Sequence, residues 1–263
     1  MNKSTNILAI TFLFAATALM TSCKWGQKRE EPKGKNIICL IDFSDAKNAN
    51  ERLKFYMTAI KENIIPKLGL YDKVTVLPID RASVTNSSDI FLANLSQKNF
   101  EPEMASPMEE EQIIQDNLKK YKDTLSVKFE ESFQTAINNR NKSSLGTDIF
   151  GALEVAKNKL SSSDENYVCL FSDMMNWTNT LKMEPQDFNA GKLEHSLAKA
   201  QNVDLSNANI IVLTGEQVDV SADHFNLVKS FWTKYFQSNN AKLYDYNSAS
   251  LTKLKEVMNL ITE

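Results

Sequence analysis

Two hydrophobic patterns alternate along the chain. Short apolar runs of strand length lie at residues 37–41, 73–79, 90–95, 167–171, 208–213 and 241–246. Longer segments with apolar residues every three or four positions lie at 48–67, 109–139, 149–160, 193–200, 223–238 and 251–261. An apolar run between polar residues is typical of a strand that is buried on both faces. The alternation therefore predicts an α/β fold, doubly wound, with a mostly parallel central sheet flanked by helices in three layers.

Three local features refine this outline. Residues 90–95 have polar flanks and suit an edge strand, and residues 98–107 contain two prolines without a period, which predicts a loop. The long helix at 109–139 is expected to bend or break once, near Ser126. Thr147 or Asp148 is suited to cap the helix that begins at residue 149, because their side-chain oxygens can accept from free backbone N–H groups.

The first part of the chain differs from the rest. Lys3 precedes an apolar run at 7–20, whose 14 residues are fewer than the roughly 20 that a membrane span needs. The run and the following Thr21-Ser22-Cys23 predict an export signal. They resemble a bacterial lipoprotein signal, in which a small residue precedes the cysteine that is lipidated.

The lipoprotein resemblance implies a division of the chain. Residues 1–22 would be a signal peptide, residues 23–35 the lipidated Cys23 and a polar tether, and residues 36–263 the folded domain. The protein would then lie in the cell envelope, periplasmic or surface-facing, with the lipid as its contact with the membrane. The alternative is an ordinary secretory signal, in which Cys23 is incidental.

Composition narrows the class of protein. The 263 residues are 42% hydrophobic, enough for one globular domain with a sizeable core, and the net charge of -3 argues against a nucleic-acid partner. Cys39 and Cys169 lie inside apolar runs. An exported protein can form disulfides, but a bridge between neighbouring strands demands unusual geometry, so we expect buried free thiols.

Histidines and tryptophans offer little further chemistry. His195 and His224 lie apart on segments expected to be surface helices, and His224 is more suited to open a helix than to bind zinc. Trp232 and Phe236 belong to an apolar helix face and are expected in the core. Trp177 follows a strand end directly, so it either stands exposed at that edge of the sheet or covers it.

Hydroxyl and carboxylate side chains recur where predicted strands end. Asp42 and Ser44 follow the first apolar run, and Asp173 follows the run at 167–171; Thr147 precedes a helix. Ligands of open α/β sheets bind at the carboxyl ends of the strands, so we expect these loops to converge. Each residue alone could merely cap a helix, and it is their joint occurrence that indicates a site.

These residues also resemble a known family. Asp-Phe-Ser-Asp-Ala at 42–46, Gly-Thr-Asp-Ile-Phe-Gly-Ala-Leu at 146–153 and Leu-Phe-Ser-Asp at 170–173 are similar to three signatures of the von Willebrand factor type A domain. The resemblance covers nearly all of residues 36–263 and implies a metal-ion-dependent adhesion site. Its residues would be Asp42, Ser44, Thr147 and Asp173, with Asp45 and Asp148 as accessory residues.

The implied ion is Mg²⁺ or Mn²⁺. Ser44 and Thr147 would bind it directly, whereas Asp42 and Asp173 would act directly or through water; Mg²⁺ prefers such oxygen ligands. Ala46, however, stands where the family has a second serine, so one direct ligand is lost. The site is then weak, uses another water, or is vestigial, and the sequence leaves these alternatives open.

Three functions are compatible with these features. The first is a lipid-anchored binding module that is not an enzyme and that engages a protein partner, with an acidic residue of the partner completing the metal site. The second is a metal-free structural or assembly subunit on the same fold. The third, a phosphoryl hydrolase with Asp42 as nucleophile, is disfavoured because Ser44 stands where a second aspartate would act as acid or base.

Overall fold

The computed structural model describes residues 32–44, 49–85, 88–102, 104, 106–139, 146–214, 220–248, 255–256 and 259. Contacts between Cα atoms divide the chain into two units, Met1–Pro32 and Lys33–Glu263. The expected signal peptide, Cys23, Asp45 and Ala46 lie outside the described residues, as does most of the expected closing helix at 251–261. These expectations remain predictions.

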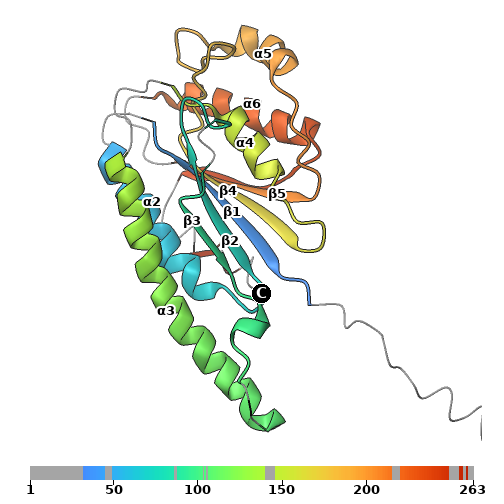
Figure 1. Ribbon diagram of the computed structural model, residues 1–263. Coiled ribbons are helices and arrows are strands. Elements are labelled where there is room, and N and C mark those ends of the chain that lie inside the picture. Colours follow the sequence, from blue (N-terminus) through green and yellow to red (C-terminus); the bar gives the residue numbers. More distant parts are fainter. Residues whose placement is uncertain are drawn as a thin grey trace, which may run out of the picture. The chain divides into compact units, whose positions relative to one another are not determined.

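A six-stranded sheet forms the centre of the second unit (Figure 1). Its strands are β1 (Lys35–Asp42), β2 (Lys73–Ile79), β3 (Phe91–Asn94), β4 (Glu165–Phe171), β5 (Ala208–Thr214) and β6 (Lys242–Ser248). Their order is β3-β2-β1-β4-β5-β6, and the pairs are parallel except for the antiparallel pair of β2 and β3. The predicted α/β fold, and β3 as an edge strand, are confirmed.

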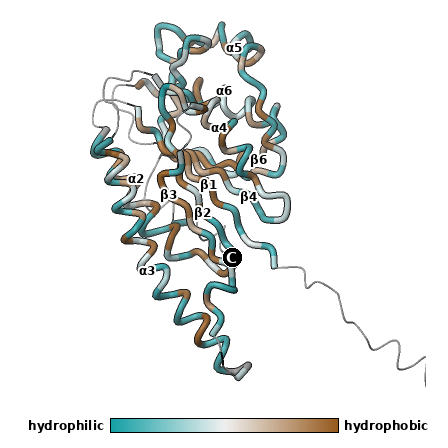
Figure 2. The backbone as a smooth tube through the Cα atoms, in the orientation of Figure 1, coloured by the Kyte–Doolittle hydropathy of each residue, from teal (hydrophilic) through white to brown (hydrophobic). Residues whose placement is uncertain are grey.

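Helices pack against both faces of the sheet. They are α2 (Ala49–Asn63), α3 (Pro107–Asn139), α4 (Ile149–Lys157), α5 (Leu193–Lys199) and α6 (Ala222–Ser238), with short 3-10 turns η1 (Ile65–Lys67), η2 (Gln97–Asn99) and η3 (Ala190–Lys192). In β1, Ile37 and Ile41 face the core beneath α2 and α3, while Ile38 and Leu40 face the core beneath α4 and α6. Figure 2 shows the hydrophobic positions gathered along the strands.

Some predicted boundaries and one predicted break are wrong. Helix α3 is continuous through Ser126 and does not break there, since the Ser126 hydroxyl donates to the carbonyl of Lys122 (3.0 Å) without interrupting the helix. A bend near Ser126 stays a prediction. The helix predicted over 48–67 ends at Asn63, because Pro66 lies in the separate turn η1 and lacks the N–H that a continuing helix needs. The predicted loop 98–107 overlaps η2, and its Pro107 is the first residue of α3, a position that tolerates proline.

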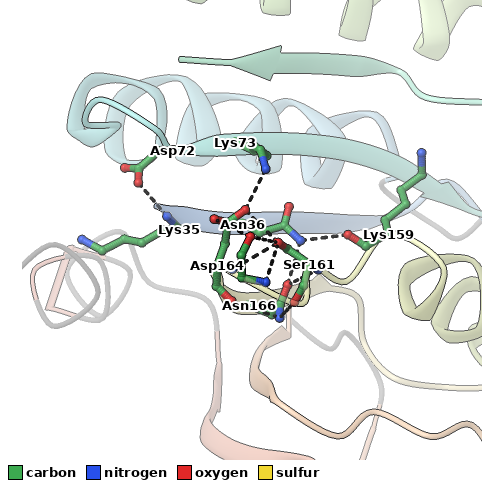
Figure 3. Close-up of polar contacts among 9 residues, drawn as sticks. Lys35, Asn36, Asp72, Lys73, Lys159, Ser161, Asp164 and Asn166 are labelled. Atoms are coloured by element: carbon green, nitrogen blue, oxygen red, sulfur yellow. Dashed lines mark hydrogen bonds and ion pairs between the residues drawn. The ribbon is translucent and has the colours of Figure 1, made fainter. Parts of the chain in front are cut away.

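The amino ends of β1 and β4 are joined by buried polar side chains (Figure 3). Asn36 Nδ2 donates to Asn166 Oδ1 (2.8 Å), which also accepts from the backbone N–H of Ser161 (2.7 Å). Lys73 on β2 forms an ion pair with Asp164 (2.7 Å). This edge of the sheet lies opposite the candidate site, and its polar groups satisfy one another.

The two cysteines of the domain are free and buried, as predicted. Cys39 on β1 lies opposite Cys169 on β4 in the sheet register. A hydrogen bond with Cys169 and burial raise the pKa of the Cys39 thiol, which keeps it protonated near neutral pH. Among the described residues, no helix is both long and apolar enough to span a membrane.

The aromatic and histidine predictions meet different outcomes. Trp232 and Phe236 are fully buried, as expected. His224 lies in the first turn of α6, which Ser221 caps, as predicted, but its side chain is buried although it was predicted on a surface helix. Its side chain is 7% exposed, with Nε2 at 2.7 Å from the carbonyl oxygen of Met183. This polar partner allows the imidazole to be buried.

Candidate site at the carboxyl edge of the sheet

Asp42 is the last residue of β1 and is fully buried. Its Oδ1 accepts from the backbone N–H of Ser44 (2.9 Å), and its Oδ2 accepts from the hydroxyl of Ser172 (2.8 Å), the residue that follows β4. The Ser172 hydroxyl in turn accepts from the backbone N–H of Met174 (3.0 Å). Asp42 therefore ties together the loops that follow β1 and β4, as the convergence of strand ends predicts.

Asp173 lies beside Asp42 in the same group. Its Oδ1 accepts from the backbone N–H of Met175 (2.9 Å), and 26% of its side chain is exposed. Burial and the neighbouring charge of Asp42 raise the pKa of the Asp173 carboxyl to about 6, although the guanidinium of Arg52 acts in the opposite direction. Two carboxylates so close compete for whatever positive charge lies nearby.

That positive charge comes from Arg52, in the first turn of α2. Its Nη1 lies 3.7 Å from Asp173 Oδ2, its Nη2 donates to the carbonyl of Ser44 (3.5 Å), and its side chain is 12% exposed. Burial opposes the charge, but the carboxylates of Asp42 and Asp173 outweigh it and raise the pKa of the guanidinium. Arg52 is not among the site residues predicted from the sequence. The sequence feature that indicates its position is the spacing of four residues between Arg52 and the buried Tyr56. Residues four apart lie on the same face of a helix, so Arg52 is expected on the sheet-facing side of α2.

Thr147 and Asp148 belong to an adjacent group of contacts. The backbone of Thr147 exchanges hydrogen bonds with that of Trp177 (3.1 and 2.8 Å), and the N–H of Asp148 donates to the carbonyl of Asp80 after β2 (2.7 Å). Asp148 also caps α4 by accepting from the N–H of Gly151 (2.9 Å), which confirms the predicted cap. The loops that follow β2 and β4 therefore hold Thr147 in place.

The residues present fit a divalent cation poorly. A cation bound by Asp42 and Asp173 would lie next to the guanidinium of Arg52, and like charges repel strongly where water is scarce. Both carboxylate oxygens of Asp42 already accept hydrogen bonds. In the part of the chain that the structure describes, no three His, Cys, Asp or Glu side chains are placed to hold a metal ion.

An open cleft of about 610 Å³ lies next to Thr147 at the same edge. Three cations line it, Arg81 after β2, Lys182, and Lys199 at the end of α5, together with Asp148, Phe150 and Trp177. Trp177 is half-buried, so it both lines the cleft and covers the sheet edge. Its indole N–H is buried and has no hydrogen-bond partner among the described residues, and Lys182 Nζ lies 5.8 Å from the centre of its ring.

Comparisons with known proteins found similar solved structures but no matching family. No protein-family model matches the chain, and no curated protein matches it. Solved structures that are similar to it include proximal thread matrix protein 1 from the mussel byssus, with 13% identity and a TM-score of 0.45 over 89% of this chain and 48% of the mussel protein. This chain thus spans about half the length of that protein.

Two bacterial structures are similar to the same extent. A von Willebrand factor type A protein from Catenulispora acidiphila has 11% identity and a TM-score of 0.43, over 88% of this chain and 42% of its own. The conserved hypothetical protein BatB from Bacteroides thetaiotaomicron has 12% identity and a TM-score of 0.45, over 87% of this chain and 98% of its own.

The raised pKa of Asp173 gives a pH dependence of stability. The folded-state value of about 6 lies above the roughly 3.9 of an unfolded chain, so the contribution is fully present below pH 4 and is lost as the pH rises through 6. Since a quarter of the side chain is exposed, we expect a loss of about 1–3 kcal/mol between these limits. Urea unfolding between pH 4 and 7 measures it.

Two variants separate this effect from the titration of other groups. Asp173→Asn cannot titrate and should flatten this part of the stability profile, whereas Asp187→Asn, at an exposed position, should leave it unchanged. The charged groups that face Asp173 are Asp42 and Arg52. Tyr246 also interacts with Asp173, but burial and the charge of Asp173 raise the pKa of Tyr246 far above the pH range of this experiment. An Asp173→Asn profile as steep as that of the wild type would show that another group is responsible.

Proposed function

We propose that this chain is a binding module of the cell envelope, anchored by lipid at Cys23, that engages a protein partner at the carboxyl edge of its sheet. The observation that carries this proposal is the cleft beside Thr147. Its volume lies in the range of protein binding sites, and its lining combines a few apolar side chains, such as Phe150 and Trp177, with a majority of polar and charged ones. The anchor rests on the lipoprotein-like sequence at the start of the chain.

The chemistry of the cleft favours an acidic segment of the partner. The chain as a whole has a net charge of -3, yet Arg81, Lys182 and Lys199 gather in this cleft. Asp148, a carboxylate that also lines the cleft, is engaged in capping α4. A carboxylate of the partner would complement the three cations, and electrostatic complementarity of this kind gives specificity.

The geometry around Asp42 supports binding over phosphoryl hydrolysis. A carboxylate nucleophile must reach its substrate, whereas Asp42 is fully buried and holds two hydrogen bonds. The second candidate, a metal-free assembly subunit, is favoured by the position of Arg52 between Asp173 and Ser44. The two candidates differ in whether the partner at this edge is transient or permanent.

Photo-crosslinking with the full-length chain in its native host tests the proposal. A photoreactive residue at Asn179, exposed in the cleft, should give one discrete adduct with another protein. The same residue at Ser162, exposed beyond the amino edge of the sheet, should not. The distribution of the adduct between washed membranes and extract also shows whether the chain is anchored.

Charge reversal then identifies the surface that binds. The double variant Lys182→Glu/Lys199→Glu should reduce the Asn179 adduct severalfold, because it reverses two charges of the cleft. The matched control, Lys119→Glu/Lys128→Glu on the exposed side of α3, changes the net charge equally and should leave the adduct intact. Equal crosslinking from Asn179 and Ser162, or an adduct indifferent to the cleft reversal, would contradict this proposal.

A further inference from the structure

We infer that the guanidinium of Arg52 stands in place of a divalent cation at the Asp42 and Asp173 group, so that this site holds its arrangement without a metal ion. This inference does not depend on the proposed partner. It concerns how the chain balances charge at the residues that resemble a metal-ion-dependent adhesion site.

The first argument is charge balance. Asp42 is fully buried and Asp173 is largely so, and two carboxylates in such a place need a nearby cation. In a metal site, the ion supplies that charge. Here the guanidinium supplies it, with Nη1 at 3.7 Å from Asp173 Oδ2.

The second argument is the position of the guanidinium within the group. Arg52 Nη2 donates to the carbonyl of Ser44 (3.5 Å), while the N–H of Ser44 donates to Asp42. Arg52 thus contacts one residue that the resemblance assigns as a ligand and the backbone of a second. A planar guanidinium can bind several such oxygens at once, as a bound cation does.

The third argument is that Arg52 is held by a rigid element. Its neighbour Leu53 and the next-turn residue Tyr56 are fully buried, which fixes α2 against the sheet. Tyr56 also packs against Phe171, the last residue of β4, with ring centroids 5.4 Å apart. The guanidinium is therefore delivered to Asp173 by packing and does not depend on a mobile surface side chain.

A second position in the sequence also disfavours a metal ion. Ala46 stands where the resemblance expects a serine that binds the ion, so a ligand is absent in the same chain that places a cation beside Asp173. The absence of this serine and the presence of the Arg52 guanidinium both disfavour a metal ion at this group.

Thermal unfolding of the full chain in detergent tests this inference, with EDTA, Mg²⁺ and Mn²⁺ as the compared additions. A cation at 100 times its dissociation constant would raise the Tm of a domain of this size by about 5–10 °C. We expect the wild type to show no such rise. Arg52→Met should acquire it, because Asp42 and Asp173 then lose the charge of the guanidinium, and Arg52→Met/Asp42→Ala should lose it again.

Two controls and one direct measurement complete the test. Arg52→Lys retains the charge and should behave like the wild type, as should Arg81→Met, which removes an exposed arginine elsewhere at this edge. If Arg52→Met does not fold, the spectrum of free Mn²⁺ in the presence of wild type and Arg52→Lys still decides, because neither should bind the ion. A wild-type Tm rise that Asp42→Ala abolishes, wild-type Mn²⁺ binding, or a folded Arg52→Met without a metal response would overturn the inference.

Discussion

Replacing Trp232 with Ala is expected to lower the free energy of unfolding by about 3–5 kcal/mol, the range for removing a large aromatic side chain from a core. Trp232 is fully buried and packs against the rings of Phe150, Phe231, Tyr235 and Phe236. Its Nε1 also donates to the carbonyl of Met174 (2.9 Å). The substitution therefore leaves a cavity and removes one of the two hydrogen bonds that the Met174 carbonyl accepts, the other coming from the N–H of Asn176 (3.1 Å).

The bond to Met174 links this core residue to the candidate site. Met174 directly follows Asp173, its backbone adopts a positive φ of 64°, and its N–H donates to Ser172. Losing the indole N–H removes a constraint on a conformation that is costly for a residue with a side chain. We therefore expect Trp232→Ala to loosen the loop that carries Asp173 as well as the core.

Urea unfolding of three variants measures these contributions. Trp232→Phe keeps an aromatic ring but not the N–H, so its free energy of unfolding should lie between those of the wild type and Trp232→Ala. Leu92→Ala, at a position that is 62% exposed, should change the free energy of unfolding by less than about 0.5 kcal/mol. A Trp232→Ala protein as stable as Leu92→Ala would refute the assigned role of this core.

The second large effect is expected at the opposite edge of the sheet, where Asn166→Ala should cost about 2–4 kcal/mol. Asn166 is buried, accepts from Asn36 and from the N–H of Ser161, and donates to the carbonyl of Ser161 (2.8 Å) (Figure 3). The smaller side chain removes partners of the half-buried backbone groups of Ser161 and of the buried amide of Asn36. Polar groups that lose a partner away from water incur a desolvation penalty.

A matched control is available in the same network. Asn209 donates a single hydrogen bond to the backbone carbonyl of Asn166 (3.2 Å) and is only partly buried, so Asn209→Ala should cost less than half as much. Equilibrium unfolding in urea compares the two. Equal losses would mean that the side-chain bonds of Asn166 contribute little and that the amino ends of β1 and β4 are held by their backbone pairing alone.

The strands were predictable because their signals are local. The parallel strands β1, β2, β4 and β5 are buried on both faces, so their runs of apolar residues are visible in the sequence, and the six predicted strand segments match the six described strands. Helix ends were harder. Proline at 66 ends one helix and proline at 107 begins another, so the same residue type marked opposite boundaries.

The candidate site was predictable only in part. Asp42, Ser44 and Asp173 do converge, since parallel strands bring their carboxyl ends to one edge. The burial of His224 was not predicted, because the imidazole is hydrogen-bonded to the carbonyl of Met183, which lies 41 residues away in the sequence. Arg52 was overlooked for a similar reason. Its partner Asp173 lies on another strand loop, and no local pattern pairs them.

The sequence by itself determined the alternation of strands and helices, the edge position of β3, a helix cap at Thr147 or Asp148 and the side of the sheet where polar groups gather. These features follow from periodicity and from residues near one another in the chain. The tertiary structure alone decided which charges meet: Arg52 with Asp173, and Arg81 with Lys182 and Lys199 around Trp177. Such contacts depend on how distant segments pack, so the identity of the cation at this site becomes visible only in the folded chain.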